Sequence, residues 1–486
     1  MRCGYATLLL IILSACAHYP VNPPLAGNID PNHGYRYANL KLPRIDDTFV
    51  VLAFSGGGSR AAGFSYGVLL EMQNTKMPGG RTMLDYIDVI SSVSGGSFTA
   101  MQFGLRGPEG LGELKANFLD QNIQGMLFRA VFFNPRNWIR LLFPNFHRID
   151  IAQEIYDRQL FKNADFAALL AAQGKGRPLI IANATELEVG ARFEWTQDQF
   201  DPICSDLSSV HVSRAVAASS AFPGLLSPMV VNSYTSRCGY TVPPWVANAR
   251  QDEDVNPERT RNAIELESYI DARRGFLHLM DGGIADNIGL RSPLHAVISG
   301  DTFVAPVPGD PSRTGFTIQG QLNRNVIKNL LFIVVTAEPD SRAVAIDSKS
   351  RLPNIVQIVS AVINTPMGNY SFDTIDLLRE TFQAAQIRQS GPAQCQDAAR
   401  RQNPNCPDAK IRGADQPQTG YYKTIVSFPL VRDEKLRQRL NAIPTSFELG
   451  PGKLDDLVAG ARGVIDCSEE YRAFVEKLGG IVRPCK

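Results

Sequence analysis

Apolar runs that end abruptly in small residues recur along the chain and predict the strands of a buried sheet. Thr48–Phe54 is a continuous apolar run, and Ile87–Val93 is rich in β-branched residues. Helix-compatible segments follow them, about Ala61–Met72 after the first run and Phe98–Phe103 after the second. Strand, small-residue turn and helix, repeated in this order, predict an α/β domain with an open, mostly parallel sheet flanked by helices.

The same patterns continue further along the chain. Strands are predicted at 178–185, 276–280 and 330–336, with a hairpin partner at 192–195 and a small-residue helix at 213–220. The highly charged residues 249–264 predict a solvated excursion. The C-terminal part has helical patterns at 367–388, 454–465 and 470–478 and a strand-like one at 421–429. We therefore expect a domain over residues 48–340 and a mixed extension of unknown role over residues 341–486.

The sharpest turn signal is Ser92-Val93-Ser94-Gly95-Gly96, between the second strand and its helix. Small neighbours let the backbone fold tightly, so that the Ser94 hydroxyl stands at the apex and faces the helix N-terminus. This is the pattern of a nucleophile elbow, G-x-S-x-G, with Ser92 in place of the first glycine. Alone it is a weak motif, because turns rich in serine and glycine are common.

The first strand runs into Gly56-Gly57-Gly58-Ser59-Arg60. Glycines before a helix cradle a nucleotide phosphate or supply amides to an oxyanion. The Gly-Lys-Ser/Thr of a P-loop is absent, and Gly58–Gly63 fits a dinucleotide fingerprint poorly. An oxyanion hole at Gly56, Gly57 and Gly58 explains the turn together with Ser94, so we prefer it.

Asp281 ends the strand at 276–280 and precedes Gly282 and Gly283. Sites in open α/β sheets form at the carboxyl ends of strands, where Asp281 can take the Ser94 proton, and Asp286 and Asn287 can orient the loop. The competing interpretation is a turn aspartate that binds its own loop. Ser94 and Asp281 are far apart in sequence, and we expect a parallel sheet with both strand ends on one edge to bring them together.

The N-terminus has the pattern of an export signal: a positive start at Arg2, a short apolar core and Leu13-Ser14-Ala15-Cys16. The core is much shorter than the roughly twenty residues of a membrane-spanning helix. Leu13–Cys16 resembles the lipobox of bacterial lipoproteins, which implies cleavage after residue 15 and acylation of Cys16. Ala17, rather than Asp, then favours the outer membrane, with the protein facing the periplasm or the cell surface. Residues 16–47, rich in Pro, Asn and Asp, predict a tether.

Composition narrows the function classes. The chain of 486 residues carries a formal net charge of +1 and no long basic run, so we expect no nucleic-acid partner. Its six histidines have no metal-ligand spacing, and we expect neither metal nor cofactor. Six cysteines besides Cys16 remain after the leader, and an even number in an exported protein predicts disulfides. Nearest-neighbour pairing gives 204–238, 395–406 and 467–485, one of fifteen connectivities.

Residues 126–148 alternate aromatic and aliphatic side chains with Arg129, Arg136, Arg140 and Arg148. Two interpretations stay open: a segment that lies on a lipid surface or covers an apolar pocket, and buried helices with arginines at their rim.

Three motifs occur in order, Gly56–Arg60, Ser92–Gly96 and Asp281–Gly283, and together they resemble the patatin-like phospholipase family, relatives of the cytosolic phospholipases A2. Ala217–Pro223 also resembles a segment of that family, and the likeness covers roughly residues 48–340. The resemblance implies a three-layer architecture, a Ser94–Asp281 dyad without histidine, an oxyanion hole at the glycine turn, and hydrolysis of phospholipid or other lipid esters.

Two other functions are also compatible with the sequence. One is a Ser-His-Asp esterase in which His278 or His295 completes a triad. The other is a non-catalytic lipid-binding envelope lipoprotein that keeps the fold. The sequence names no protein partner.

Overall fold

The computed structural model describes residues 22–40, 45–223, 226–251, 253–254, 257–298, 322, 326–339, 355–402 and 418–485. The predicted N-terminal leader and the acylation site at Cys16 lie outside these residues. Within them, no helix has both the length and the apolar character needed to cross a membrane.

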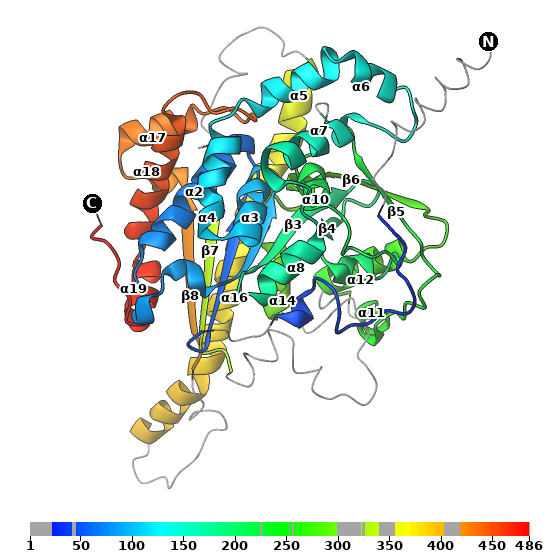
Figure 1. Ribbon diagram of the computed structural model, residues 1–486. Helices are drawn as coiled ribbons and strands as arrows, with labels where there is room; N and C mark the ends of the chain where they lie inside the picture. The colour runs from blue at the N-terminus through cyan, green and yellow to red at the C-terminus, as the bar shows by residue number, and fades with distance from the viewer. Residues whose placement is uncertain are drawn as a thin grey trace, which may run out of the picture.

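One mixed sheet organises the described part of the chain (Figure 1). Its strands lie in the order β5-β6-β3-β2-β1-β7-β8, and β4 pairs with β3 off this path. The strands are β1 (Thr48–Phe54), β2 (Ile87–Val93), β3 (Leu179–Glu186), β4 (Arg192–Glu194), β5 (Met229–Asn232), β6 (Phe276–Asp281), β7 (Asn329–Thr336) and β8 (Gly420–Ser427).

The five strands from β3 to β8 are parallel to their neighbours, whereas β4, β5 and β6 pair in antiparallel fashion. All side chains of β1, β2, β3 and β7 are buried, because helices cover both faces of the parallel part. The predicted α/β class with a mostly parallel sheet is confirmed.

The α-helices of the first part are α2 (Gly58–Asn74), α3 (Gly95–Arg106), α4 (Pro108–Leu114), α5 (Ile123–Phe132), α6 (Pro135–Arg140), α7 (Arg148–Tyr156), α8 (Phe166–Gly174), α9 (Gln197–Phe200) and α10 (Val212–Ser219). Those of the second part are α11 (Pro244–Ala249), α12 (Pro257–Tyr269), α13 (Gly283–Asp286), α14 (Arg291–Ile298), α16 (Ile355–Gln402), α17 (Glu434–Asn441), α18 (Lys453–Asp466) and α19 (Glu469–Lys477).

Strand β8 shows how the layers are built. Successive side chains of a strand point to opposite faces: the Tyr421 ring meets Phe382 of α16, with ring centroids 5.3 Å apart, and the Tyr422 ring meets Phe474 of α19, also at 5.3 Å. Helices α16 and α19 therefore lie on opposite faces of the sheet. The boundary expected at residue 340 falls between β7 and β8, which pair along their whole length, so the C-terminal part completes the same sheet.

Strand β6 runs in the direction opposite to the one we expected. Strand β6 is antiparallel to β3. The two strands pair through the last residues of β6, from Leu279, opposite Glu186, to Asp281, opposite Ala184. Because Asn183 is level with Val93 at the end of β2, the last residue of β6 still arrives beside the turn after β2. The expected location of Asp281 holds, although the predicted reason, a parallel strand, was wrong.

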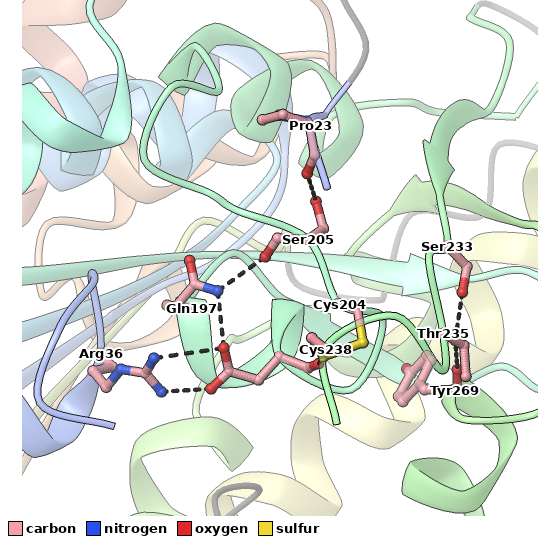
Figure 2. The surroundings of a disulfide bond; sticks show 10 residues. Pro23, Arg36, Gln197, Cys204, Ser205, Ser233, Thr235, Cys238 and Tyr269 are labelled. Atoms are coloured by element: carbon pink, nitrogen blue, oxygen red, sulfur yellow. Dashed lines mark hydrogen bonds and ion pairs between the residues drawn. A yellow bond between two sulfur atoms is a disulfide. The ribbon is translucent and has the colours of Figure 1, made fainter. Parts of the chain in front are cut away.

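Two of the three predicted disulfides are present, Cys204–Cys238 and Cys467–Cys485. The third lies outside the described side chains. Figure 2 shows the surroundings of Cys204–Cys238, with Arg36 and Gln197 beside it. The buried Arg36 guanidinium donates to Asp201 at 2.7 Å, and Tyr35 Oη donates to the Ile180 carbonyl at 3.0 Å. Residues 22–40, expected as part of a free tether, are therefore packed against the domain.

The described part of the charged excursion expected at residues 249–264 is also structured. Helix α12 begins at Pro257, and its Ala263 and Leu266 form a small apolar cluster with Val246 and Ala249 of α11. The apolar residues of α12 that pack on α11 have helical spacing, but the many charged residues between them make this amphipathic pattern hard to recognise in the sequence.

Candidate active site

Ser94 lies at a strained turn between β2 and α3. Its backbone has φ +49° and ψ −118°, a conformation that non-glycine residues rarely adopt and that is typical of a nucleophile elbow. A Cβ on Gly95 would clash with the Gly58 carbonyl oxygen, and one on Gly96 would lie 2.8 Å from the Phe54 carbonyl oxygen. Only glycine fits at these two positions, which confirms the steric reason for the small residues after Ser94.

Ser92 departs from the usual glycine without disturbing this turn. Its side chain is buried, and its hydroxyl donates to the Ile181 carbonyl of the neighbouring strand at 2.9 Å. The position has room for one small polar side chain whose hydrogen bond is satisfied inside the sheet.

Asp281 faces Ser94 from the end of β6. The Ser94 hydroxyl lies close enough to its carboxylate to lower the pKa by hydrogen bonding, and the Gly283 amide donates to Oδ1 at 2.9 Å. Ser94 is 6% exposed and Asp281 is 4% exposed. Burial outweighs both hydrogen bonds and raises the pKa of Asp281 to about 6. The carboxylate is therefore a stronger base than an aspartate in water.

The glycine turn lies beside the elbow and presents two amides. Gly57 has φ +135° and Gly58 has φ +61°, which favour glycine. Within the described residues neither amide donates a hydrogen bond to the protein, as is usual at a helix N-terminus. The Gly56 amide, by contrast, donates to the Asn287 carbonyl at 2.9 Å. Of the three predicted oxyanion residues, Gly57 and Gly58 thus have amides available for a ligand.

Ser219, at the end of α10, forms hydrogen bonds with both the serine turn and the aspartate loop. Its hydroxyl accepts from the Ser94 amide at 2.8 Å and lies 3.0 Å from the Ser97 hydroxyl, and its carbonyl accepts from the Gly282 amide at 3.1 Å. The sequence singled out Ala217–Pro223 only through the family resemblance and gave Ser219 no role.

A second network surrounds Asn287, which the sequence singled out as a residue that can orient the loop, and it includes Glu338, which the sequence analysis missed. Its side chain donates to Glu338, which also accepts from Ser371 of α16 at 2.7 Å. Burial raises the pKa of Glu338. Since the Asn287 carbonyl holds the Gly56 amide, this network connects α16 and the aspartate loop to the glycine turn. Glu338 follows β7, so its place at a strand end was the one signal that could have found it.

The histidines of the alternative triad lie elsewhere. His278 is exposed on β6, and His295 Nε2 lies 3.0 Å from the Asn262 amide nitrogen. Among the hydrogen bonds of Ser94 and Asp281 to described residues, none involves a histidine. The geometry brings Ser94, Asp281 and the glycine turn together at one edge of the sheet.

A sequence model of the family described as "Patatin-like phospholipase" matches residues 52–294, which include all three motifs. No curated protein sequence matches the chain. Among solved structures, human GIVD cytosolic phospholipase A2 in complex with methyl gamma-linolenyl fluorophosphonate and terbium chloride is similar, with 12% identity and a TM-score of 0.38 over 91% of this chain and 61% of that one.

A second structure of the human enzyme matches with 14% identity and a TM-score of 0.31 over 61% of this chain and 44% of that one. VipD from Legionella pneumophila matches with 10% identity and a TM-score of 0.28 over 90% of this chain and 68% of that one. The chain thus spans 44–61% of the human phospholipase chains in these two matches.

Proposed function

This chain belongs to the patatin-like phospholipase family, and from that premise we propose that it hydrolyses acyl ester bonds in lipids with a Ser94–Asp281 dyad. The observation that carries the proposal is the buried Asp281 carboxylate beside the Ser94 hydroxyl, with a pKa of about 6. At neutral pH this carboxylate is ionised and can accept a proton.

The reaction would proceed in two halves. Asp281 takes the Ser94 proton as the serine oxygen attacks the ester carbonyl, and the Gly57 and Gly58 amides hold the oxyanion that forms. Collapse of this intermediate breaks the ester bond, and the leaving alkoxide takes the proton from Asp281. Water, deprotonated by Asp281, then attacks the acyl-enzyme. Its collapse breaks the bond to Ser94 Oγ, which takes the proton back from Asp281, and the fatty acid leaves.

The test is hydrolysis of a short-chain ester and of phospholipid by the purified protein. Ser94→Ala and Asp281→Asn should each reduce turnover by at least about a thousandfold, and the double variant should be little worse, because the two residues act as a unit. His278→Ala and His295→Ala are the matched controls and should retain substantial activity.

Two results would reject this proposal in different ways. Loss of activity in a folded His278→Ala or His295→Ala variant would favour the Ser-His-Asp esterase. Absence of hydrolysis by the wild-type protein on every ester, with lipid binding intact, would favour the non-catalytic lipoprotein.

We also propose that the protein is an outer-membrane lipoprotein anchored by acylated Cys16, on the evidence of Leu13–Cys16. Several acyl chains at about 0.8 kcal/mol per buried methylene hold a protein on a bilayer permanently. Cys16→Ser should leave an unacylated, mislocalised product. Incorporation of labelled palmitate by that variant, with unchanged fractionation, would contradict the anchor.

A further inference from the structure

Helices α5 and α6 lie at one end of the molecule (Figure 1). They and the turn after them expose large apolar side chains. We call this set the α5–α6 surface. Its members are between 46% and 83% exposed, and they are Phe128, Phe132, Phe133, Trp138, Ile139 and Leu142. Single exposed apolar residues are ordinary, but a contiguous set marks an interaction site.

The α5–α6 surface is additional to the face with which α5 packs on the domain. Ile123 and Leu127 of α5 are buried, as expected for the inner face of a surface helix. Phe128 and Phe132, four residues apart, lie on the outer face with ring centroids 4.8 Å apart, and Phe133 is 5.8 Å from Phe128. Both faces of α5 are thus apolar, and only the inner one is covered by described residues.

The charged side chains within this segment all have one sign. Between Asp120 and Asp150 the sequence has no acidic residue and four arginines. Arg129 and Arg136 are exposed, whereas Arg140 pairs with Glu154 and lies 3.8 Å over the Phe146 ring. Exposed aromatic side chains with arginines between them match a bilayer surface that contains anionic headgroups.

The α5–α6 surface is held in place by hydrogen bonds within the segment. The Trp138 indole donates to the Val131 carbonyl at 3.1 Å, and the Asn137 side chain donates to the Ala130 carbonyl at 2.9 Å. Both bonds join α6 to α5. The apolar side chains are therefore presented by a preorganised pair of helices, which reduces the ordering cost of binding.

Backbone hydrogen bonds link helix α5, through residues 446 and 447, to the glycine turn of the proposed active site. The Gln124 amide of α5 donates to the Phe447 carbonyl at 3.1 Å. The adjacent Ser446 carbonyl accepts from the Ser59 amide at 2.8 Å, directly after the glycine turn. A bilayer that meets the α5–α6 surface would lie on the side of the molecule where the oxyanion turn is held.

The short stretch of chain between Cys16 and the packed N-terminal segment agrees with such an arrangement. The packed N-terminal segment begins at Asn22, six residues after Cys16 in the sequence. Six residues span at most about 22 Å, so an acylated Cys16 would keep the domain close to the membrane.

We infer that the α5–α6 surface docks on the surface of a bilayer that contains anionic phospholipid. The inference rests in part on the proposed function, since a lipid hydrolase must reach esters that lie in a membrane. Docking puts the aromatic side chains among the acyl chains and the exposed arginines among the headgroups.

The experiment measures quenching of Trp138 fluorescence by vesicles of brominated phosphatidylcholine, with and without phosphatidylglycerol. It uses the full chain with Ser94→Ala, so that the vesicles remain intact. Trp195 is buried and Trp245 is partly buried, and Trp138→Phe in the same background identifies the signal from Trp138. Quenching should be present with phosphatidylglycerol, weaker without it or at high salt, and absent in Trp138→Phe.

Paired substitutions test the contribution of the apolar side chains. Phe132→Ser with Phe133→Ser should lower the docking equilibrium constant at least about tenfold. Phe276→Ser, at a phenylalanine that is 58% exposed on β6, is the matched control and should leave docking unchanged. Circular dichroism checks that each variant is folded.

The outcomes separate this inference from the proposed function. Absence of Trp138 quenching, or equal quenching after the Phe132→Ser and Phe133→Ser changes, would overturn the inference even if the wild type hydrolyses esters. A lipid-free dimer that these substitutions disperse, without quenching by vesicles, would also overturn it and assign the surface to a second copy. Quenching by a protein that hydrolyses no ester would keep the inference and reject the proposed function.

Discussion

Asp281 illustrates how burial converts an ordinary side chain into a base. A carboxylate in water is a weak base toward a serine hydroxyl, and the two hydrogen bonds that Asp281 receives would weaken it further. Desolvation exceeds both effects and raises its pKa to about 6. The sequence could suggest Asp281 from its place between a strand and two glycines, but not its basicity, because burial depends on the whole fold.

The first prediction is the pH dependence of hydrolysis. Only the ionised Asp281 can take the Ser94 proton, so kcat/KM should fall as the pH drops through about 6. The measurement is a pH profile on a short-chain neutral ester. His278→Ala should show the same profile. A rate that stays constant well below pH 5, where folding persists, would mean that Asp281 is not the base.

The second prediction concerns stability. The folded-state pKa of Asp281, about 6, lies above the unfolded value near 3.9, so the folded state binds the proton more tightly. Protonation of Asp281 therefore adds to the free energy of unfolding below about pH 4, and this stabilisation is lost as the pH rises through about 6. At pH 7, Asp281→Asn should therefore increase the free energy of unfolding by about 1–3 kcal/mol.

Denaturant unfolding at pH 7 and at pH 4 measures this effect. The increase in the free energy of unfolding caused by Asp281→Asn should shrink toward zero at pH 4. Destabilisation at pH 7 would show instead that the charged carboxylate contributes more through its hydrogen bonds than burial costs.

At the scale of elements, the site depends on contacts between segments that are distant in sequence. Strands β1, β2 and β7 and the turns after β1 and β2 followed from apolar runs and glycines. The direction of β6 did not, because a strand pattern is the same in either direction and only its partner decides. The role of Ser219 was equally hidden, since its hydroxyl meets the Ser94 amide across 125 positions.

The third prediction tests Ser219. Ser219→Ala leaves the buried Ser94 amide without an acceptor, which should cost about 1–3 kcal/mol of stability. The elbow should also loosen, and kcat should fall roughly tenfold. Ser220→Ala is the matched control, because Ser220 directly follows α10 and its hydroxyl donates to the Val216 carbonyl of that helix. An equal loss of kcat in both variants would assign the effect to α10 as a whole.

At the scale of the molecule, the C-terminal part completes the domain. Helix α18 packs on α2, where a Cβ on Gly67 would lie 2.9 Å from both the Ala461 Cβ and the Val458 Cα. The sequence predicted α18 and β8 as elements but assigned them to an extension, because the connection from β7 to β8 is long and carries no motif. The even number of cysteines, by contrast, predicted disulfides, and nearest-neighbour pairing along the chain gave Cys204–Cys238 and Cys467–Cys485 correctly.

The fourth prediction tests this packing. Gly67→Leu would separate α2 from α18, since the nearest atoms include backbone, and should lower the free energy of unfolding by at least about 2 kcal/mol. Gly463→Leu is the matched control on α18, where a Cβ meets no atom within 4 Å. Denaturant unfolding should show little change for the control. Equal stability of the two variants would mean that α18 does not pack tightly on α2.

The most direct test of the central claim is to locate the covalent adduct that an alkyl phosphonate forms with the protein. A phosphonate reacts with a serine that a base has activated, so mass spectrometry should find one adduct, on the peptide that carries Ser94. Asp281→Asn should slow the labelling at least about a hundredfold, and His278→Ala should not. An adduct on another serine, or no adduct in a folded and lipid-binding protein, would contradict the Ser94–Asp281 dyad.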